Sequence, residues 1–332
     1  MTVSTQSFAY VSDLVRKHSA IQLAPGKEYL VEARLGPLAR EKGLQGPDAV
    51  DSYVRRYLRG GSPTETVRVV EAMTTNETSW FRDTSPFTAL RRAILPELAG
   101  ADLSIWSAAC STGQEPYSIA MVLREERVRS YRILATDINA QVVERARTGR
   151  YSQLEINRGL PAPMMVRWFQ RNGHDWQIAE ELRRTITFAK HNLLDPAPAG
   201  PFDIVFLRNV LIYFDLETKR SILGRVHRAL RPGGYLVLGA AETTIGVDGD
   251  WERVPVERGS VYRPVQAGVV PAPRPAPGTL TGATPVIPAT APRVPAAAAP
   301  TSAWPVQPRP ATTLPTAPRR PAGPAFEQGV TR

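Results

Sequence analysis

The chain has 332 residues, of which 42% are apolar, and it carries a formal net charge of +10. This length allows two compact domains with a substantial core, and no run approaches the roughly 18 apolar residues of a membrane span, so we expect no membrane insertion. The N-terminus shows no signal-peptide pattern and the single cysteine, Cys110, excludes an intrachain disulfide framework, so we expect a cytoplasmic protein.

The positive charge is unevenly distributed along the chain. Residues 264–332 carry six arginines and one acid, Glu327, so about half of the excess charge lies there. The rest of the chain mixes both signs without a concentrated basic stripe, which disfavours a nucleic-acid partner.

Residues 1–75 are predicted to form an all-helical domain. The apolar residues at positions 50, 53, 54, 57 and 58 repeat at the spacing of an amphipathic helix, and those at 8, 11, 14 and 15 do the same. A third helix around 27–42 contains Gly36-Pro37, which we expect to kink or divide it.

From about residue 100, short apolar runs alternate with helical stretches. The runs are 103–109, 131–137, 202–209 and 234–240, and the helices are predicted at 114–127, 139–148 and 215–230. This alternation predicts a mainly parallel, doubly wound α/β sheet covered on both faces. A short antiparallel hairpin formed by 176–180 and 184–190 is predicted beside it.

The C-terminal part of the chain has a different composition. Residues 264–332 contain 17 of the 31 prolines and no periodic apolar pattern, so we predict that they form no core. A flexible tail and a tether with a docking role are both open.

The segment 107–118 joins the first strand to the first helix, where an α/β fold binds its ligand. Small residues occupy every second position, at Ser107, Ala109, Ser111 and Gly113, so a ligand can approach the backbone closely. Only Gly113 is a glycine, so the segment is not the dinucleotide fingerprint, which disfavours NAD and phosphate-loop functions. Taken alone, the segment also fits a tight strand–helix turn without a ligand.

Asp137 follows the second strand, 24 residues after Gly113. A carboxylate at this strand end can accept hydrogen bonds from ribose hydroxyls. The alternative is an N-cap at the helix that follows, and the two roles are compatible. The loop, the spacing and the strand context together predict a ligand that contains a nucleoside.

Five motifs carry a resemblance to a known family: MTTNETSWFRD (73–83), WSAACSTGQEPYSIAM (106–121), ATDIN (135–139), HNLLD (191–195) and RNVLIYFD (208–215). In order and spacing they resemble the motifs of chemotaxis receptor glutamate O-methyltransferases of the CheR type, over about residues 5–265. The resemblance implies a Rossmann-like methyltransferase fold with S-adenosylmethionine as cofactor and S-adenosylhomocysteine as product. It also implies methyl transfer to glutamate side chains of methyl-accepting chemotaxis receptors, through their cytoplasmic helical region.

The resemblance divides the chain into functional parts. A helical receptor-recognition domain is expected at 1–75 and a segment contacting the cofactor at 76–99. The methyltransferase domain is expected at 100–265 with a β-insert at about 172–190, and the proline-rich tail at 266–332 lies outside the resemblance.

The resemblance also implies roles for individual residues. Cofactor contacts are implied for Asn76, Thr78, Arg82, Glu115, Asp137, Asn192, Leu193, Arg208 and Asn209, in addition to Ala109 and Gly113 of the loop. Glu115 would bind the amino-acid portion of the cofactor, and Asp137 its ribose. Tyr213 would lie near the transferred methyl group. The candidates for receptor contact are Arg34, Arg40 and Lys42, and no metal is expected. Each residue also admits a structural role, such as a first-turn acid for Glu115.

The chain departs from the family pattern in three places. Gln114-Glu115-Pro116 stands where Glu-Glu-Pro is expected, and Ala240-Ala241-Glu242 where His-Ser-Glu is more usual. The hairpin around 173–188 is short beside family inserts that dock a receptor's C-terminal peptide, so we do not expect such tethering.

The implied reaction needs no general base, because a glutamate with a pKa of roughly 4.3 is already ionised at neutral pH. Charge is lost along the reaction path, so a dry pocket and alignment of the reactants should carry the rate. We expect Arg82 to orient the acceptor carboxylate and Tyr213 to pack or donate a hydrogen bond. Two other functions are open: methylation of another carboxylate or a small molecule, and a non-catalytic cofactor-binding adaptor in a signalling array.

Overall fold

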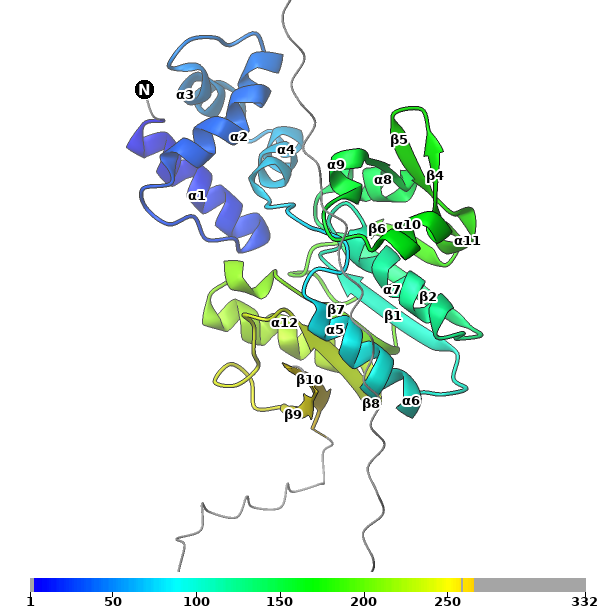
Figure 1. Cartoon of the computed structure of the whole chain (residues 1–332). Coiled ribbons are helices and arrows are strands. Elements are labelled where there is room, and N and C mark those ends of the chain that lie inside the picture. The colour runs from blue at the N-terminus through cyan, green and yellow to red at the C-terminus, as the bar shows by residue number, and fades with distance from the viewer. Residues whose placement is uncertain (1–2, 258, 266–332) are drawn as a thin grey trace, which may run out of the picture. The chain divides into compact units, whose positions relative to one another are not determined.

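The computed structural model describes residues 3–257 and 259–265. This part contains a helical domain followed by an α/β domain (Figure 1). The tail predicted from residue 266 lies outside the described residues. Within them, no helix is long and apolar enough to cross a membrane.

The helical domain consists of α1 (Thr5–Ser19), α2 (Glu28–Glu41), α3 (Ala49–Tyr53), a π-helical turn (Val54–Leu58) and α4 (Pro63–Met73). Its core is built from fully buried side chains such as Val11, Leu35 and Tyr53. The hydroxyl of Ser62 accepts the N–H of Glu65 at the start of α4, as at a typical helix N-cap. The helical domain predicted from the apolar periodicity is confirmed.

The helix α2 continues through its proline. We predicted that Gly36-Pro37 kinks or divides the helix at 27–42, and the division is wrong, because one helix runs from Glu28 to Glu41 with Pro37 inside it. Leu35 and Ala39, on either side of the proline, are fully buried in the domain core. Tertiary packing of this face offsets the roughly 3 kcal/mol that an internal proline costs a helix.

The α/β domain is built on a seven-stranded sheet in the order β6-β2-β1-β7-β8-β10-β9. Its strands are β1 (Leu103–Ala108), β2 (Tyr131–Asp137), β6 (Ile186–Lys190), β7 (Phe202–Leu207), β8 (Leu230–Leu238), β9 (Trp251–Val256) and β10 (Gly259–Pro264). The first five in this order are parallel, whereas β10 is antiparallel to both β8 and β9. The predicted mainly parallel α/β fold is confirmed.

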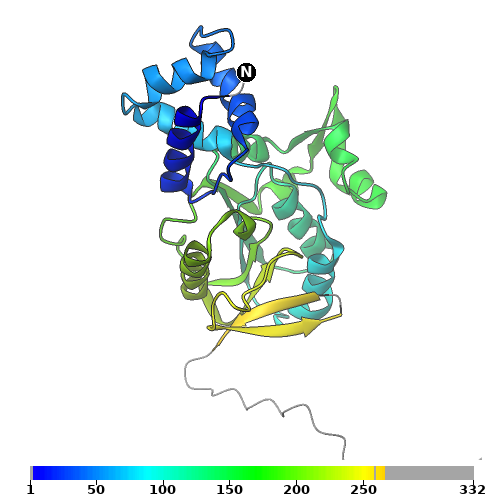
Figure 2. The same cartoon turned by 90° about the vertical axis from the view of Figure 1, so that its left-hand side faces the viewer.

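Helices cover both faces of this sheet (Figure 2). One face packs against α7 (Gln114–Glu125), α8 (Ala140–Thr148) and the segment formed by α5 (Thr84–Ala89), a π-helical turn (Leu90–Ile94) and α6 (Leu95–Glu97). The other face packs against α12 (Leu216–Ala229). β1 and β7 are buried at every position, because side chains on both faces meet helices.

The predicted hairpin of 176–180 and 184–190 is wrong in its pairing. β6 is an edge strand of the main sheet and runs parallel to β2. Its Ile186 and Phe188 are buried in the main core, and α11 (Glu180–Arg183) separates it from the preceding strand. The β-insert therefore does not extend to residue 190.

The insert is a separate three-stranded antiparallel sheet in the order β3-β5-β4 (Figure 1). Its elements are β3 (Arg150–Ser152), α9 (Gln153–Ile156), α10 (Ala162–Trp168), β4 (Phe169–Asn172) and β5 (Asp175–Ile178). It begins well before the predicted boundary at 172. We expected no tethering of a receptor peptide because the hairpin looked short. The insert is larger than that hairpin, so its size no longer supports this expectation.

Candidate functional site

A cavity opens at the carboxyl ends of the parallel strands, and it measures about 910 Å³ when its open mouth is included. Its walls come from the loops that follow β1, β2, β6 and β7, from the segment 74–78, and from Ser19 and Ile21 of the helical domain. This is the edge of the sheet at which α/β folds bind their ligands.

The cavity brings together most of the residues that the sequence singled out. Its lining includes Asn76, Thr78, Arg82, Ala109, Glu115, Asp137, Asn192, Leu193, Arg208, Asn209 and Tyr213. Gly113 packs elsewhere: a Cβ added to it would lie 2.9 Å from the Ala146 Cβ and 3.0 Å from the Tyr151 hydroxyl. Its φ of 92° also favours glycine, so close packing and backbone conformation account for this residue.

Asp137 is buried at the end of β2. Its Oδ2 accepts the Ser111 N–H at 2.8 Å and its Oδ1 accepts the Asn139 N–H at 3.0 Å, so each oxygen keeps a further lone pair. Burial raises the pKa of Asp137 above its ordinary value, although these N–H groups act in the opposite direction. The N-cap of α8 is Asn139, whose Oδ1 accepts the Gln141 N–H, so the N-cap alternative for Asp137 is wrong.

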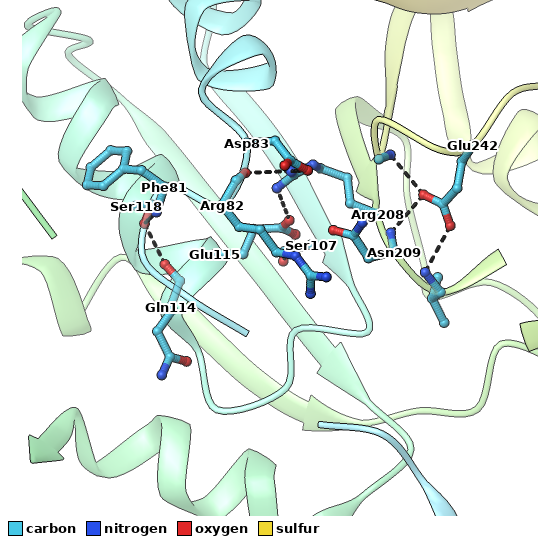
Figure 3. Close-up of polar contacts among 12 residues, drawn as sticks. Phe81, Arg82, Asp83, Ser107, Gln114, Glu115, Ser118, Arg208, Asn209 and Glu242 are labelled. Atoms are coloured by element: carbon cyan, nitrogen blue, oxygen red, sulfur yellow. Dashed lines mark hydrogen bonds and ion pairs between the residues drawn. The ribbon is translucent and has the colours of Figure 1, made fainter. Parts of the chain in front are cut away.

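Arg208 joins three segments of the site at the end of β7, with a side chain only 1% exposed. One guanidinium nitrogen donates to Glu115 Oε2 at 2.9 Å, and the other donates to the Arg82 carbonyl at 2.6 Å and to Asp83 Oδ2 at 3.1 Å (Figure 3). Glu115 Oε1 accepts the Ser107 hydroxyl at 2.8 Å. The buried ion pair therefore fixes the first turn of α7 and the Arg82 backbone against β1 and β7.

Left-handed backbone at non-glycine residues gathers around this cavity. The residues concerned are Phe81, Asp83, Ala109, Ser111 and Asn209, with φ between 47° and 60°. Phe81 and Asp83 flank Arg82, and each strained residue costs on the order of 1–3 kcal/mol. Ser118 holds one flank, because its hydroxyl accepts the Phe81 N–H at 3.1 Å and donates to the Gln114 carbonyl at 2.7 Å (Figure 3). Arg208 holds the other flank, so the backbone of Arg82 is fixed from both sides.

The Arg82 side chain keeps donors available for a ligand. One guanidinium nitrogen donates to the Glu77 carbonyl at 3.0 Å, and the side chain forms no ion pair with any residue in 3–257 or 259–265. A guanidinium with free donors at the wall of a cavity is suited to hold a carboxylate.

The three residues predicted to meet a receptor lie in different settings. Arg34 donates to the Met73 and Thr74 carbonyls and to the Thr75 hydroxyl, so its guanidinium holds the end of α4 and the segment that lines the cavity. Lys42 forms an ion pair with Glu65 at 2.7 Å. Of the three, only Arg40 is exposed.

A second group of residues lines the cavity, although none of them was predicted as a cofactor contact. They are Ser19, Ile21, Thr74, Thr75, Glu77, Cys110, Ser111, Ile138, His191, Val210 and Phe214. All but Ser19 and Ile21 lie within the five motifs, which could have identified them, but nothing in the sequence places Ser19 and Ile21 beside the sheet. Burial raises the pKa of the Cys110 thiol well above its ordinary value, and the nearby carboxylates act in the same direction, so this cysteine is not a thiolate nucleophile.

Comparison with known proteins assigns both domains. Residues 6–74 match the family described as CheR methyltransferase, all-alpha domain, and residues 76–259 match CheR methyltransferase, SAM binding domain. The chain is similar to the chemotaxis protein methyltransferase Cher2 of Pseudomonas putida, with 40% identity over 276 residues that cover 79% of this chain and 99% of that protein. It is also similar to the chemotaxis protein methyltransferase of Vibrio parahaemolyticus, with 40% identity over 273 residues that cover 79% and 98%.

These matches extend over both domains and confirm the resemblance drawn from the five motifs. They also confirm S-adenosylmethionine as the cofactor. The chain therefore belongs to the CheR methyltransferase family and is an S-adenosylmethionine-dependent methyltransferase.

Proposed function

We propose that this enzyme transfers the methyl group of S-adenosylmethionine to glutamate side chains of chemotaxis receptors, and so forms glutamyl methyl esters. The observation that supports this most is one cavity in which Arg82 and Tyr213 lie beside the proposed cofactor residues. The similar proteins are named as chemotaxis protein methyltransferases, which favours an acceptor in that system.

The side chains of the cavity fit this cofactor. Asp137 has a lone pair available on each oxygen, so it can accept both ribose hydroxyls. Ile138 and Leu193 offer apolar surface to the adenine ring. The charged pair of Glu115 and Arg208 suits the zwitterionic amino-acid portion.

The residues of the chain have a limited task in the proposed reaction. The bound cofactor supplies an activated methyl carbon on a sulfonium. The acceptor carboxylate is already ionised, so no residue has to remove a proton. Arg82 orients that carboxylate through its free donors, but a rigid bidentate pair would stabilise the ground state more than the charge-depleted transition state. The cavity walls exclude water, which would otherwise stabilise the separated charges of the reactants.

Replacing Arg82 by alanine should lower kcat by about 100-fold, because the acceptor loses its alignment. Folding should be unaffected, since the Arg82 guanidinium makes one hydrogen bond, to the Glu77 carbonyl. Turnover is measured at saturating cofactor and receptor. The control is Arg158→Ala, which removes the guanidinium that pairs with Glu77 on the surface. Unchanged kcat in Arg82→Ala would contradict the orienting role.

Receptor contact is proposed for the surface of α2 around Arg40, the exposed member of the three candidates. Arg34 instead holds the end of α4, and Lys42 pairs with Glu65. Charge reversal in Arg40→Glu should slow receptor methylation by on the order of three- to tenfold at low salt. The effect should shrink at high salt, because the Debye length falls from about 30 Å at 0.01 M to about 3 Å at 1 M. Arg56→Glu, at another exposed position of the same domain, is the control. A slowing that does not change with salt would count against electrostatic contact.

The acceptor is tested by incubating the enzyme with labelled cofactor and receptor-containing membranes. A base-labile methyl ester on the receptor would support the proposal. Stable label, or label on another molecule, would favour a different acceptor, and cofactor binding without transfer would favour the adaptor function.

A further inference from the structure

The carboxylate of Glu242, in the turn after β8, accepts four backbone N–H groups. Oε2 accepts those of Asn209 at 2.7 Å and Gly239 at 2.8 Å, and Oε1 accepts those of Val210 at 2.9 Å and Leu211 at 2.8 Å (Figure 3). A carboxylate offers about four lone-pair sites, so this one is fully used by the backbone.

Glu242 acts only through these bonds. It forms no ion pair with the residues that the structure describes, so the N–H dipoles balance its charge. It lines a second hollow between α5 and β10, whereas the lining of the cofactor cavity does not include it. Glu242 therefore does not touch the reacting groups.

The segment that Glu242 holds is the turn from β7 to α12. Within it, Leu211–Tyr213 form a 3₁₀ turn (η3), and the first N–H groups of such a turn have no partner inside it. Asn209, just before it, has a φ of 56°, a conformation that costs energy for a residue with a side chain. By accepting charge-assisted hydrogen bonds, the Glu242 carboxylate satisfies the N–H groups of Val210 and Leu211 at the start of the turn. Its bond to the Asn209 N–H holds that residue in its left-handed conformation.

The same turn carries one wall of the cavity. Asn209, Val210, Tyr213 and Phe214 all line it. Gly239 leaves room for this arrangement, because a Cβ there would lie 2.6 Å from Glu242 Oε2 and 2.8 Å from Asn209 Nδ2. The ends of β7 and β8 thus meet at a single carboxylate.

We propose that Glu242 is a positioning residue for methyl transfer, and that its carboxylate sets the turn that presents Asn209 and Tyr213 to the reacting groups. The inference rests on the proposed function, which puts Tyr213 near the transferred methyl group.

The test compares Glu242→Gln with Glu217→Gln, which removes the same charge from an exposed position on α12. Glutamine keeps the size of Glu242 but has one acceptor oxygen and an amide nitrogen that faces N–H donors. The folded variant should lose about 100-fold in kcat, while the Kd for S-adenosylhomocysteine rises by less than about tenfold. Amide hydrogen exchange should speed up at 209–211 and 239, but not in α7.

Glu242→Asp keeps an anionic acceptor one methylene group shorter, so it should show intermediate kcat and intermediate exchange. If Glu242→Gln does not fold, the kcat and the exchange rates of Glu242→Asp test the proposal in its place. The proposal is overturned if folded Glu242→Gln turns over within about twofold of Glu217→Gln. It is equally overturned if Glu242→Asp exchanges faster at 209–211 without a loss of kcat. Exchange and S-adenosylhomocysteine binding need no acceptor, so these results can be separated from a failure of receptor methylation in the unaltered enzyme.

Discussion

Replacing Arg208 by methionine is expected to lower the free energy of unfolding by about 3–5 kcal/mol. The guanidinium is almost fully buried, so its removal leaves the Glu115 carboxylate without a cation and the Arg82 carbonyl without a donor. The expected cost comes from these uncompensated buried groups rather than from lost attraction alone. Urea unfolding followed by circular dichroism measures the change.

A double variant separates the unpaired charge from the lost packing. Glu115→Gln/Arg208→Met removes the Glu115 carboxylate together with its cation, and the glutamine can still accept the Ser107 hydroxyl. The double variant should therefore recover about 2 kcal/mol of the stability that Arg208→Met loses, since neutral replacements of a buried pair are often tolerated. It should not recover cofactor binding. Equal stability of the single and double variants would show that the unpaired carboxylate is not the cause.

A surface ion pair provides the scale for this effect. Arg145 pairs with Glu155 at 2.7 Å with its side chain 51% exposed. Arg145→Met should cost less than about 1 kcal/mol, because water and salt screen an exposed pair.

The central strands could be predicted because both faces of the sheet are covered. β1 and β7 are apolar and buried along their whole length, so each appears in the sequence as a short unbroken apolar run followed by a helix. The error at β6 has a physical reason. Alternating burial of Ile186 and Phe188 fits an edge strand of either sheet, and the choice of partner depends on packing against residues far away in the chain.

The candidate site also has a part that could be predicted from the sequence and a part that could not. Asp137 ends one parallel strand and Arg208 directly follows another, so the sequence could place both at one edge of the sheet. The bonds that fix the site could not be predicted, because they join distant segments. Glu242 accepts the N–H of Asn209, 33 residues earlier in the chain. The Arg34 side chain bonds to the end of α4, and the sequence does not indicate that this helix arginine faces inward.

Replacing Asp137 by asparagine should weaken cofactor binding by about 10- to 100-fold. Asparagine keeps the size of the side chain, but its amide nitrogen must face the N–H of Ser111 or Asn139, and the proposed ribose contact loses its charge. A hydrogen bond to a charged group contributes about 1.5–3 kcal/mol, and each 1.4 kcal/mol is about tenfold in affinity. Calorimetric titration with S-adenosylhomocysteine measures the Kd. Asp195→Asn, at an exposed position in the loop after β6, is the control.

The same carboxylate should make cofactor binding depend on pH. Burial raises the pKa of Asp137, so this group takes up its proton at a higher pH than an ordinary aspartate, whose pKa is about 3.9. The ionised form is the one that accepts two ribose hydroxyls, so affinity should be full at neutral pH and fall as the pH drops through the raised pKa. Within that window, binding should release a proton. In Asp137→Asn this acid limb should be missing; if it persists over the same pH range, another group controls the affinity.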